Sequence, residues 1–327
     1  MSGVRRVVVL LMLVTLPLIA GCGGSGAATA VSYGGVRDQS TTGYAVAELQ
    51  GFFAHQGLTF SPTWATSGTV LLQGVVSGDF DVANLGPAQL YGAIANGACA
   101  RVLRPTQGVA YGVIAQPGLG LDTTRPYPET LTQLRGRSVG VPVRGAAQEL
   151  VLRSLLTDAG LDPDTDVTWV AIGAGAAAAS TFASGKVDTA MSYPQLEVNL
   201  EAGGTGYDKL VDLAGPDTPL GAFWQSVAVA NCDWADEHHD TVLKFCHALN
   251  QGFRALEQEP DAGPRAFAWL GLASDPGPAR NLWEKYGTPV ADIPPLTEEN
   301  WNHQAKFAAG AAAPDFSEYV VDGCSTA

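Results

Sequence analysis

The chain carries one stretch of sequence twice. Residues 66–87 (TSGTVLLQGVVSGDFDVANLGP) and 173–194 (GAGAAAASTFASGKVDTAMSYP) lie 107 positions apart. In the same register they share a glycine near the start, a Ser-Gly pair, an aspartate and a final proline. Each copy follows a β-rich run, opens with small residues, closes at Ser-Gly and continues into an apolar run. This pattern indicates one unit used twice, and we interpret each copy as a βαβ unit.

The helix start in each copy is a candidate ligand site. In a βαβ unit the strands lie parallel, and ligands bind along the edge formed by the carboxyl ends of the strands. Ser67-Gly68-Thr69 and Gly173-Ala174-Gly175 would present bare backbone N–H groups there, which suits an anion or a polar acceptor. Taken singly, Gly and Ser at a helix start also serve as caps. Because this helix start with bare N–H groups recurs at matched spacing, we predict a cleft in which two lobes bind the ligand from opposite sides.

The N-terminus has the features of an export signal. Arg5 and Arg6 precede an apolar run at residues 7–20, which is too short to span a bilayer comfortably, and Ile19-Ala20-Gly21-Cys22 follows. This resembles a bacterial lipoprotein signal, in which cleavage precedes the cysteine and its sulfur takes a diacylglycerol. The resemblance implies a signal peptide at residues 1–21, an acylated Cys22 and a tether at 22–30, with the protein on the outer face of the cell membrane. The alternative is an uncleaved anchor helix.

Charge limits the classes of partner. The formal net charge of the 327 residues is -14, and it becomes -16 without residues 1–21, which hold two arginines and no acid. An acidic surface repels nucleic acid and anionic lipid headgroups, so we expect neither as a partner. A small anionic ligand is not excluded, because screening weakens distant charges relative to local donors. A composition of 46% apolar and 15% charged residues is ample for two hydrophobic cores. We expect the protein to be a monomer.

Four cysteines remain after Cys22, and an even number in an exported chain favours two disulfides with three possible pairings. They are Cys99, Cys232, Cys246 and Cys324. We disfavour the 232–246 pairing because a helix expected from about residue 235 would hold the two Cα atoms beyond the bridging limit of roughly 7 Å. Histidines near Cys246 fit no usual zinc-ligand spacing, so we expect no metal and no cofactor.

The rest of the chain alternates strands and helices. Clusters of β-forming residues predict strands at 30–33, 58–64, 80–84, 101–103, 109–116, 137–143, 167–172, 187–192 and 223–230. Caps, apolar periodicity and glycine stops predict further helices at 43–56, 87–96, 144–159, 236–257, 264–270, 278–286 and 297–310, a short helix at 128–131 and a tail at 317–327. Strands 109–116 and 223–230 are expected to cross between lobes. The lobes are then residues 31–113 with 228–327, and residues 114–227.

Four segments carry a family resemblance. They are AELQGFFAHQGLTF, LLQGVVSGDFDVANLGPAQL, LTQLRGRSVGVPVRGAAQELVLRSLLTDAGLDPDTDVTWVAIG and FASGKVDTAMSYPQLE. In this order and spacing, over residues 31–310, they resemble substrate-binding proteins of ABC importers in the nitrate, sulfonate and taurine group, which is related to the pyrimidine-precursor proteins. The resemblance implies a type II periplasmic-binding fold, with two α/β lobes joined by two crossing strands. It also implies a membrane permease and a cytoplasmic ATPase as partners.

The predicted cleft walls combine backbone donors with polar and aromatic side chains. The resemblance places solute contacts after strand 137–143, at Arg144, Gly145, Ala146 and Ala147. The loop after the first strand adds Arg37, Gln39, Ser40 and Thr41. The first repeat adds Asn84 and Gly86, and three aromatic residues are candidates for the ligand's organic body, namely Trp64, Tyr193 and Trp224. Trp224 is equally well explained as core filler of the second lobe.

Two arginines decide which ligand the sequence predicts. If Arg37 and Arg144 both face inward from opposite lobes, they clamp a carboxylate or sulfonate. The alternative is that Arg37 pairs with Asp38 at the surface and Arg144 is solvated. With aromatic walls, the clamp favours an organic sulfonate or similar small acid over nitrate, and a pyrimidine-like heterocycle is the second possibility.

Catalysis finds no support in the motifs. The chain has no G-x-S-x-G and no P-loop, and we find no paired nucleophile and base. A yeast pyrimidine synthase shares the implied fold but uses a cysteine-rich motif, whereas the cysteines here are scattered. We therefore expect a binding protein. A sensor on the same fold, which binds without delivering, is the alternative, and neighbouring permease and ATPase genes would separate the two.

Overall fold

The computed structural model describes residues 28–214, 218, 220–273, 276–287, 290 and 292–325. The predicted signal peptide and Cys22 lie outside the described residues. Within the described part, no helix has the length and apolarity needed to cross a bilayer.

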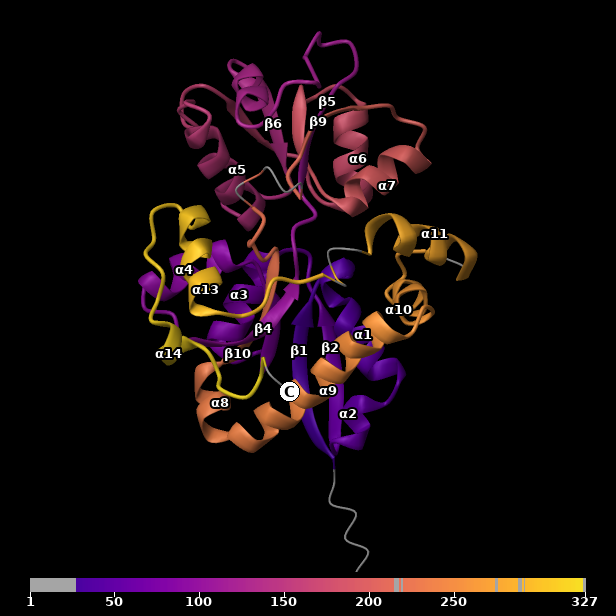
Figure 1. Cartoon of the computed structure of the whole chain (residues 1–327), viewed down its shortest axis with the longest axis vertical. Helices are drawn as coiled ribbons and strands as arrows, with labels where there is room; N and C mark the ends of the chain where they lie inside the picture. Colours follow the sequence, from indigo (N-terminus) through magenta and orange to yellow (C-terminus); the bar gives the residue numbers. More distant parts are fainter. Residues whose placement is uncertain are drawn as a thin grey trace, which may run out of the picture.

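The strands form two five-stranded sheets, stacked one above the other in Figure 1. The first has the order β2-β1-β3-β10-β4, with strands Leu58–Trp64, Thr29–Gly35, Val82–Leu85, Ser226–Asn231 and Ala100–Gln107. The second has the order β7-β6-β8-β5-β9, with strands Thr168–Ala171, Ser138–Val141, Thr189–Ser192, Gly112–Ala115 and Asp208–Asp212. In each sheet the fourth strand, β10 or β5, runs antiparallel to its neighbours. We call the sheets with their helices lobe 1 and lobe 2.

Helices flank both sheets (Figure 1). Lobe 1 carries η1 Gln39–Thr41, α1 Thr42–Leu49, α2 Phe52–His55, α3 Gly68–Ser77, α4 Pro87–Ala95, α8 Cys232–Glu237, α9 His239–Gln258, α10 Ala262–Trp269, α11 Pro276–Tyr286, α13 Glu298–Gln304, η3 Ala305–Phe307 and α14 Phe316–Tyr319. Lobe 2 carries η2 Glu129–Leu134, α5 Ala147–Asp158, α6 Gly175–Ala183 and α7 Pro194–Ala202.

The repeat is confirmed as two βαβ units, β2-α3-β3 and β7-α6-β8. In each unit the two strands lie parallel on either side of a third strand, β1 or β6. The aspartate shared by both copies has the same structural role in each. Asp81 accepts the Ser32 N–H at 2.7 Å and donates its own N–H to the Ser32 hydroxyl at 2.9 Å, and Asp188 does the same with Ser138, at 2.8 Å in both directions. The shared residue thus ties the unit to its central strand.

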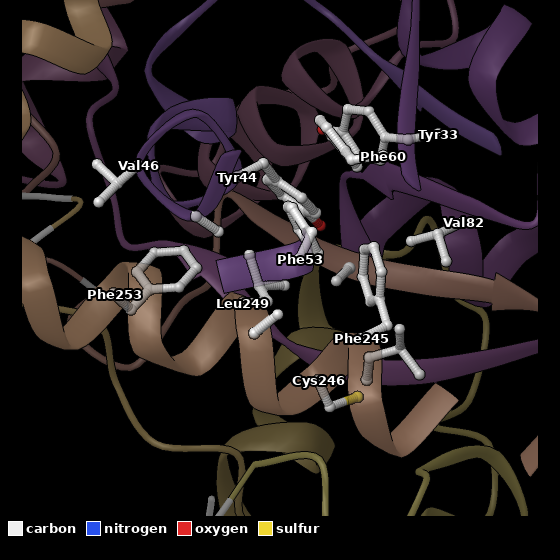
Figure 2. Packing of buried hydrophobic residues seen from close by; sticks show 14 of the residues in the cluster. Tyr33, Tyr44, Val46, Phe53, Phe60, Val82, Phe245, Cys246, Leu249 and Phe253 are labelled. Carbon is white, nitrogen blue, oxygen red and sulfur yellow. The ribbon is translucent and has the colours of Figure 1, made fainter. Parts of the chain in front are cut away.

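Aromatic rings fill the core of lobe 1 between its sheet and α9. Tyr33, Tyr44, Phe53, Phe60 and Phe245 form a chain of ring contacts with centroids 4.4 to 6.3 Å apart (Figure 2). Burying such rings contributes strongly to stability, because truncating one to alanine costs about 3–5 kcal/mol.

Helices α1 and α9 pass each other at a pair of glycines. A Cβ at Gly252 would lie 2.4 Å from the Gly43 carbonyl oxygen, so only glycine allows this approach.

Several predicted boundaries were wrong for local reasons. The helix expected at 43–56 is broken after Leu49, because Gly51 takes φ 72° and starts α2. The short helix α14, which Asp315 caps, overlaps the start of the tail predicted at 317–327, and strand β9 was not predicted. The two crossing strands are shorter than expected, since β5 lies wholly in the second sheet and β10 wholly in the first. The chain therefore crosses between lobes at residues 108–111 and again between β9 and β10.

Both predicted disulfides are present, and both lie in lobe 1. Cys99 bonds Cys232 with Cα atoms 5.5 Å apart, and Cys246 bonds Cys324 with Cα atoms 5.0 Å apart. The 232–246 pairing that helix geometry disfavoured does not occur. The second bridge ties α9 to the C-terminal segment.

Candidate functional site

A cavity of about 100 Å³ lies between the lobes, at the carboxyl ends of β1 and β3. Lobe 2 contributes the start of α5, and the crossing segments contribute Tyr111 and Gln225. The lining residues are Val36, Asp38, Ser40, Gly68, Leu71, Asn84, Leu85, Gly86, Gln89, Gln107, Tyr111, Ala146, Ala147, Gln148, Gln225 and Ser226. This is the strand edge at which α/β sheets bind ligands.

A hydrogen-bonded network centred on Asn84 forms one wall of the cavity. Its Nδ2 donates to the Ser40 hydroxyl at 2.7 Å, and its Oδ1 accepts from the Thr106 hydroxyl at 2.7 Å. The Thr106 and Ser226 hydroxyls lie 3.0 Å apart. These four residues are buried, so the network holds η1, β3, β4 and β10 in fixed positions.

Two helix N-termini from opposite lobes lie in the cavity walls, at Gly68 for α3 and at Ala146 to Gln148 for α5. At α3, Ser67 caps the helix by accepting the Val70 N–H, whereas the N–H groups of Gly68 and Thr69 have no partner among the described residues. At α5, Ala146 to Gln148 line the opposite wall. Each N-terminus carries a partial positive charge of roughly half a unit. The pair suits an acceptor or an anion.

The helix start in the second copy of the repeat does not present free N–H groups to the cavity. The Gly175 N–H at the start of α6 donates to the Tyr193 hydroxyl at 3.2 Å, and neither Gly173 nor Gly175 lines the cavity. Tyr193 occupies the position that Gly86 has in the first copy, directly before the shared proline. The Tyr193 hydroxyl therefore accepts the N–H that a ligand would otherwise use at the α6 N-terminus. In lobe 2 it is the N-terminus of α5, not that of α6, that lines the cavity.

The lobes touch beside the cavity. A Cβ at Gly86 would lie 2.6 Å from the Ala147 Cβ, so the absence of a side chain permits this approach. On one side of the interface, Lys285 of α11 pairs with Glu201 of α7 at 2.6 and 2.7 Å. On another, Lys306 of η3 pairs with Asp158 of α5 at 2.8 Å.

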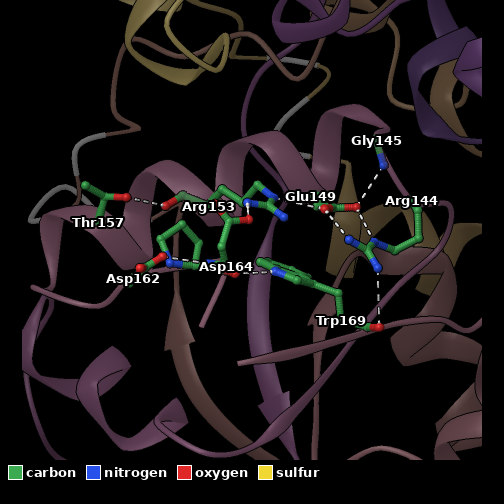
Figure 3. A network of polar contacts seen from close by, with 9 residues as sticks. Arg144, Gly145, Glu149, Arg153, Thr157, Asp162, Asp164 and Trp169 are labelled. Atoms are coloured by element: carbon green, nitrogen blue, oxygen red, sulfur yellow. Dashed lines mark hydrogen bonds and ion pairs between the residues drawn. The ribbon is translucent and has the colours of Figure 1, made fainter. Parts of the chain in front are cut away.

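The predicted arginine clamp does not form. Arg144 makes a bidentate pair with Glu149, at 2.8 and 3.1 Å, and points at the Trp169 carbonyl (Figure 3). Burial opposes ionisation of Glu149, but bonds from Arg144, the Gly145 N–H and Arg153 lower the pKa of its carboxyl. Glu149 is therefore a charged partner only five residues away, and it holds Arg144 outside the cavity.

Arg37 is likewise engaged elsewhere. Its guanidinium lies over the Trp64 ring, 4.8 Å from the centroid, and its side chain is exposed. It does not pair with Asp38 either, because that carboxylate bonds Ser40. Trp64 in turn packs on Trp269, with ring centroids 5.9 Å apart. The ring that holds Arg37 is therefore itself supported by a second tryptophan.

Trp224 is core and not a stacking wall. Its side chain is fully buried, and its indole N–H donates to the Pro294 carbonyl at 2.8 Å. Gln39 and Thr41 are also buried beneath the loop and do not line the cavity. Six of the predicted site residues do line it, namely Ser40, Gly68, Asn84, Gly86, Ala146 and Ala147.

A family comparison agrees with this architecture. The family model described as NMT1/THI5 like matches residues 38–263, more than half of the chain. The chain belongs to the NMT1/THI5-like family. A comparison with curated proteins finds no match.

Solved structures similar to this NMT1/THI5-like protein share its fold. The alkanesulfonate-binding protein SsuA from Xanthomonas axonopodis pv. citri bound to MOPS has a TM-score of 0.70 and 17% identity, covering 90% of this chain and 98% of that one. The periplasmic aliphatic sulphonate binding protein SsuA from Escherichia coli has 0.67 and 17%, covering 89% and 97%. A Candida albicans protein with the generic periplasmic binding protein fold has 0.68 and 14%, covering 89% and 96%. The predicted type II periplasmic-binding fold is confirmed.

Sequence reasoning missed several lining residues of the NMT1/THI5-like chain. Asp38 entered only in the alternative in which it pairs with Arg37 at the surface, and Gln107, Tyr111 and Gln225 were not among the predicted site residues. A signal existed for the last three. They lie at or beside the two segments predicted to cross between lobes, where any polar side chain is close to the cleft.

Proposed function

We propose that this protein is the extracytoplasmic solute-binding component of an ABC importer, which holds a small solute between its lobes and delivers it to a permease with an ATPase. The observation that carries the proposal is a cavity lined by both lobes, with the starts of α3 and α5 in its walls and N–H groups there that bond to no described residue. Family membership and a fold shared with sulfonate-binding proteins support it. These relatives support the general part of the proposal, namely that the protein binds a solute and does not catalyse a reaction.

The geometry favours a small solute with an acceptor group. The α3 and α5 N-termini offer donors from both lobes, and an anionic group such as a sulfonate accepts from several N–H groups at once. A cavity of about 100 Å³ is smaller than the roughly 300–1,000 Å³ typical of drug-sized ligands. Short organic sulfonates therefore fit better than aryl sulfonates. A pyrimidine-like heterocycle is the second candidate, favoured by the Asp38 carboxylate in the cavity wall.

Binding is proposed to couple to lobe closure. We start from the predicted lobes, residues 31–113 with 228–327 and residues 114–227, and move their boundaries to the two crossings so that all of β5 belongs to lobe 2 and all of β10 to lobe 1. The two crossings are proposed to supply a hinge near residues 108–111 and before β10. A solute that contacts both lobes stabilises the closed state by its differential contacts. Small-angle scattering with and without solute tests this step, and an unchanged radius of gyration at saturation would contradict it.

Membrane attachment is proposed from the sequence alone. Cleavage after Gly21 and acylation of Cys22 would hold a monomer near its permease without a transmembrane segment. Mass spectrometry of the membrane-extracted protein tests it, and a free Cys22 thiol contradicts it.

Calorimetry of the mature protein tests the ligand class. The titrants are taurine, alkyl and aryl sulfonates, nitrate and a hydroxymethyl-pyrimidine. We expect the tightest binding from a short organic sulfonate. Failure of every titrant contradicts the proposed ligand class, whereas uptake by a reconstituted permease distinguishes an importer component from a sensor.

A further inference from the structure

The same aspartate turn occurs at three places in the described chain. One carboxylate oxygen accepts the N–H and the hydroxyl of the residue two positions later, at 2.9 and 2.5 Å for Asp38, 2.9 and 2.6 Å for Asp122, and 2.9 and 2.7 Å for Asp315. Asp122 and Asp315 are exposed, and bonds from Thr124 and Ser317 lower the pKa of these two carboxyls. Two of the three turns thus behave as ordinary surface caps.

Asp38 is different because its turn lines the cavity. Burial raises the pKa of its carboxyl, although the Ser40 hydroxyl and N–H oppose the change. Both bonds go to Oδ1, and Oδ2 accepts none from the described residues. Among the residues that the structure describes, no lysine or arginine lines the cavity. A partly buried carboxylate without a cationic partner is costly, so this turn keeps the Oδ2 acceptor available although capping uses only Oδ1.

The cavity also holds a donor without a partner. Gln107 is 1% exposed and lines the cavity, and its Nε2 bonds to no described residue. A buried donor left unpaired costs about 1–3 kcal/mol. The tyrosines around Asp38 do not supply a positive charge to balance its carboxylate. Burial is the main cause that raises the pKa values of Tyr33, Tyr111 and Tyr193, and the Asp38 carboxylate raises them further, so these phenols stay neutral.

We propose that Asp38 is a specificity-determining residue that selects a solute carrying a nitrogen-bound hydrogen, as an ammonium or an amino-heterocycle, which donates to its Oδ2. The inference rests on the proposed function and narrows it. The solute has two ends. Its acceptor end faces the α3 and α5 N–H groups and Gln107, and its N–H end faces Asp38. A simple anion leaves the carboxylate unpaired and is rejected.

Paired probes with and without an amino group test the proposal. Calorimetry compares 2-aminoethanesulfonate with ethanesulfonate, and 4-aminopyrimidine with pyrimidine, on the wild-type protein, D38N and D315N. Asparagine can keep the oxygen that caps the turn, so D38N removes the charge and replaces the free acceptor Oδ2 with an NH2 donor, and D315N makes the same change in a matching turn that does not line the cavity. We expect the amino member of at least one pair to bind at least tenfold more tightly, and D38N to abolish that preference while D315N retains it.

The outcomes separate this inference from the function it rests on. If probes bind but in neither pair does the amino member bind more tightly than its partner without the amino group, the role of Asp38 is wrong and the solute-binding function stands. If no probe binds, the proposed ligand class fails and this inference fails with it.

Discussion

A methyl group at Gly86 should act as a wedge between the lobes. The Cβ of Gly86→Ala would lie 2.6 Å from the Ala147 Cβ, inside any real contact distance, while its next neighbour, the Gln225 carbonyl oxygen, is 3.6 Å away. Overpacking of this kind costs about 1–3 kcal/mol. The two methyl groups belong to different lobes, so the cost falls on the closed arrangement. Solute affinity should then fall by about 5- to 150-fold.

Two further variants isolate the wedge. Gly92→Ala adds a methyl group to the same helix with no atom within 4 Å, and it should leave affinity unchanged. Ala147→Gly combined with Gly86→Ala returns the gap to its original volume and should restore most of the affinity. Calorimetry with a solute identified above measures all four proteins. Wild-type affinity in Gly86→Ala, or a double variant as weak as the single one, would refute the reasoning.

Three other predictions follow from the geometry. Binding of an ammonium-bearing solute should weaken as pH falls through the raised pKa of Asp38, because protonation removes the negative charge of its carboxylate. Tyr33, Tyr111 and Tyr193 stay neutral over this range. A solute affinity that does not change with pH in acid contradicts this. The 133- and 78-residue separations of the disulfides predict a loss of about 4–5 kcal/mol for each bridge removed, measured by urea unfolding, and four alkylatable thiols without reduction would exclude the bridges. Tyr193→Phe should cost about 1 kcal/mol by leaving the Gly175 N–H unpaired, with solute affinity unchanged; a large affinity loss would return Tyr193 to the site.

The internal repeat made the fold predictable. Matched glycine, Ser-Gly, aspartate and proline positions located two βαβ units, and the structure shows why the aspartate recurs, since Asp81 and Asp188 each bond the central strand. Local boundaries were harder to predict. The break after Leu49 depends on Gly51 adopting a left-handed φ, and the sequence alone does not distinguish this from a tolerated helix glycine.

The site was less predictable than the fold because side-chain direction depends on tertiary partners. Arg144 had a strong carboxylate partner in Glu149, five residues along, and the pair satisfies both groups without a ligand. The difference between Gly86 and Tyr193, by contrast, is visible in the aligned repeat. A tyrosine where the first copy has glycine indicates that the two helix N-termini cannot have the same surroundings, and the structure shows the hydroxyl on the Gly175 N–H.

A crystal structure of the mature protein with its solute bound tests the central claim most directly. The account predicts solute density between the lobes, with an acceptor group at the N–H groups of Gly68 and Thr69 on one side and of Ala147 and Gln148 on the other, and with a nitrogen at Asp38 Oδ2. Solute bound to one lobe only, or outside this cavity, would contradict the account.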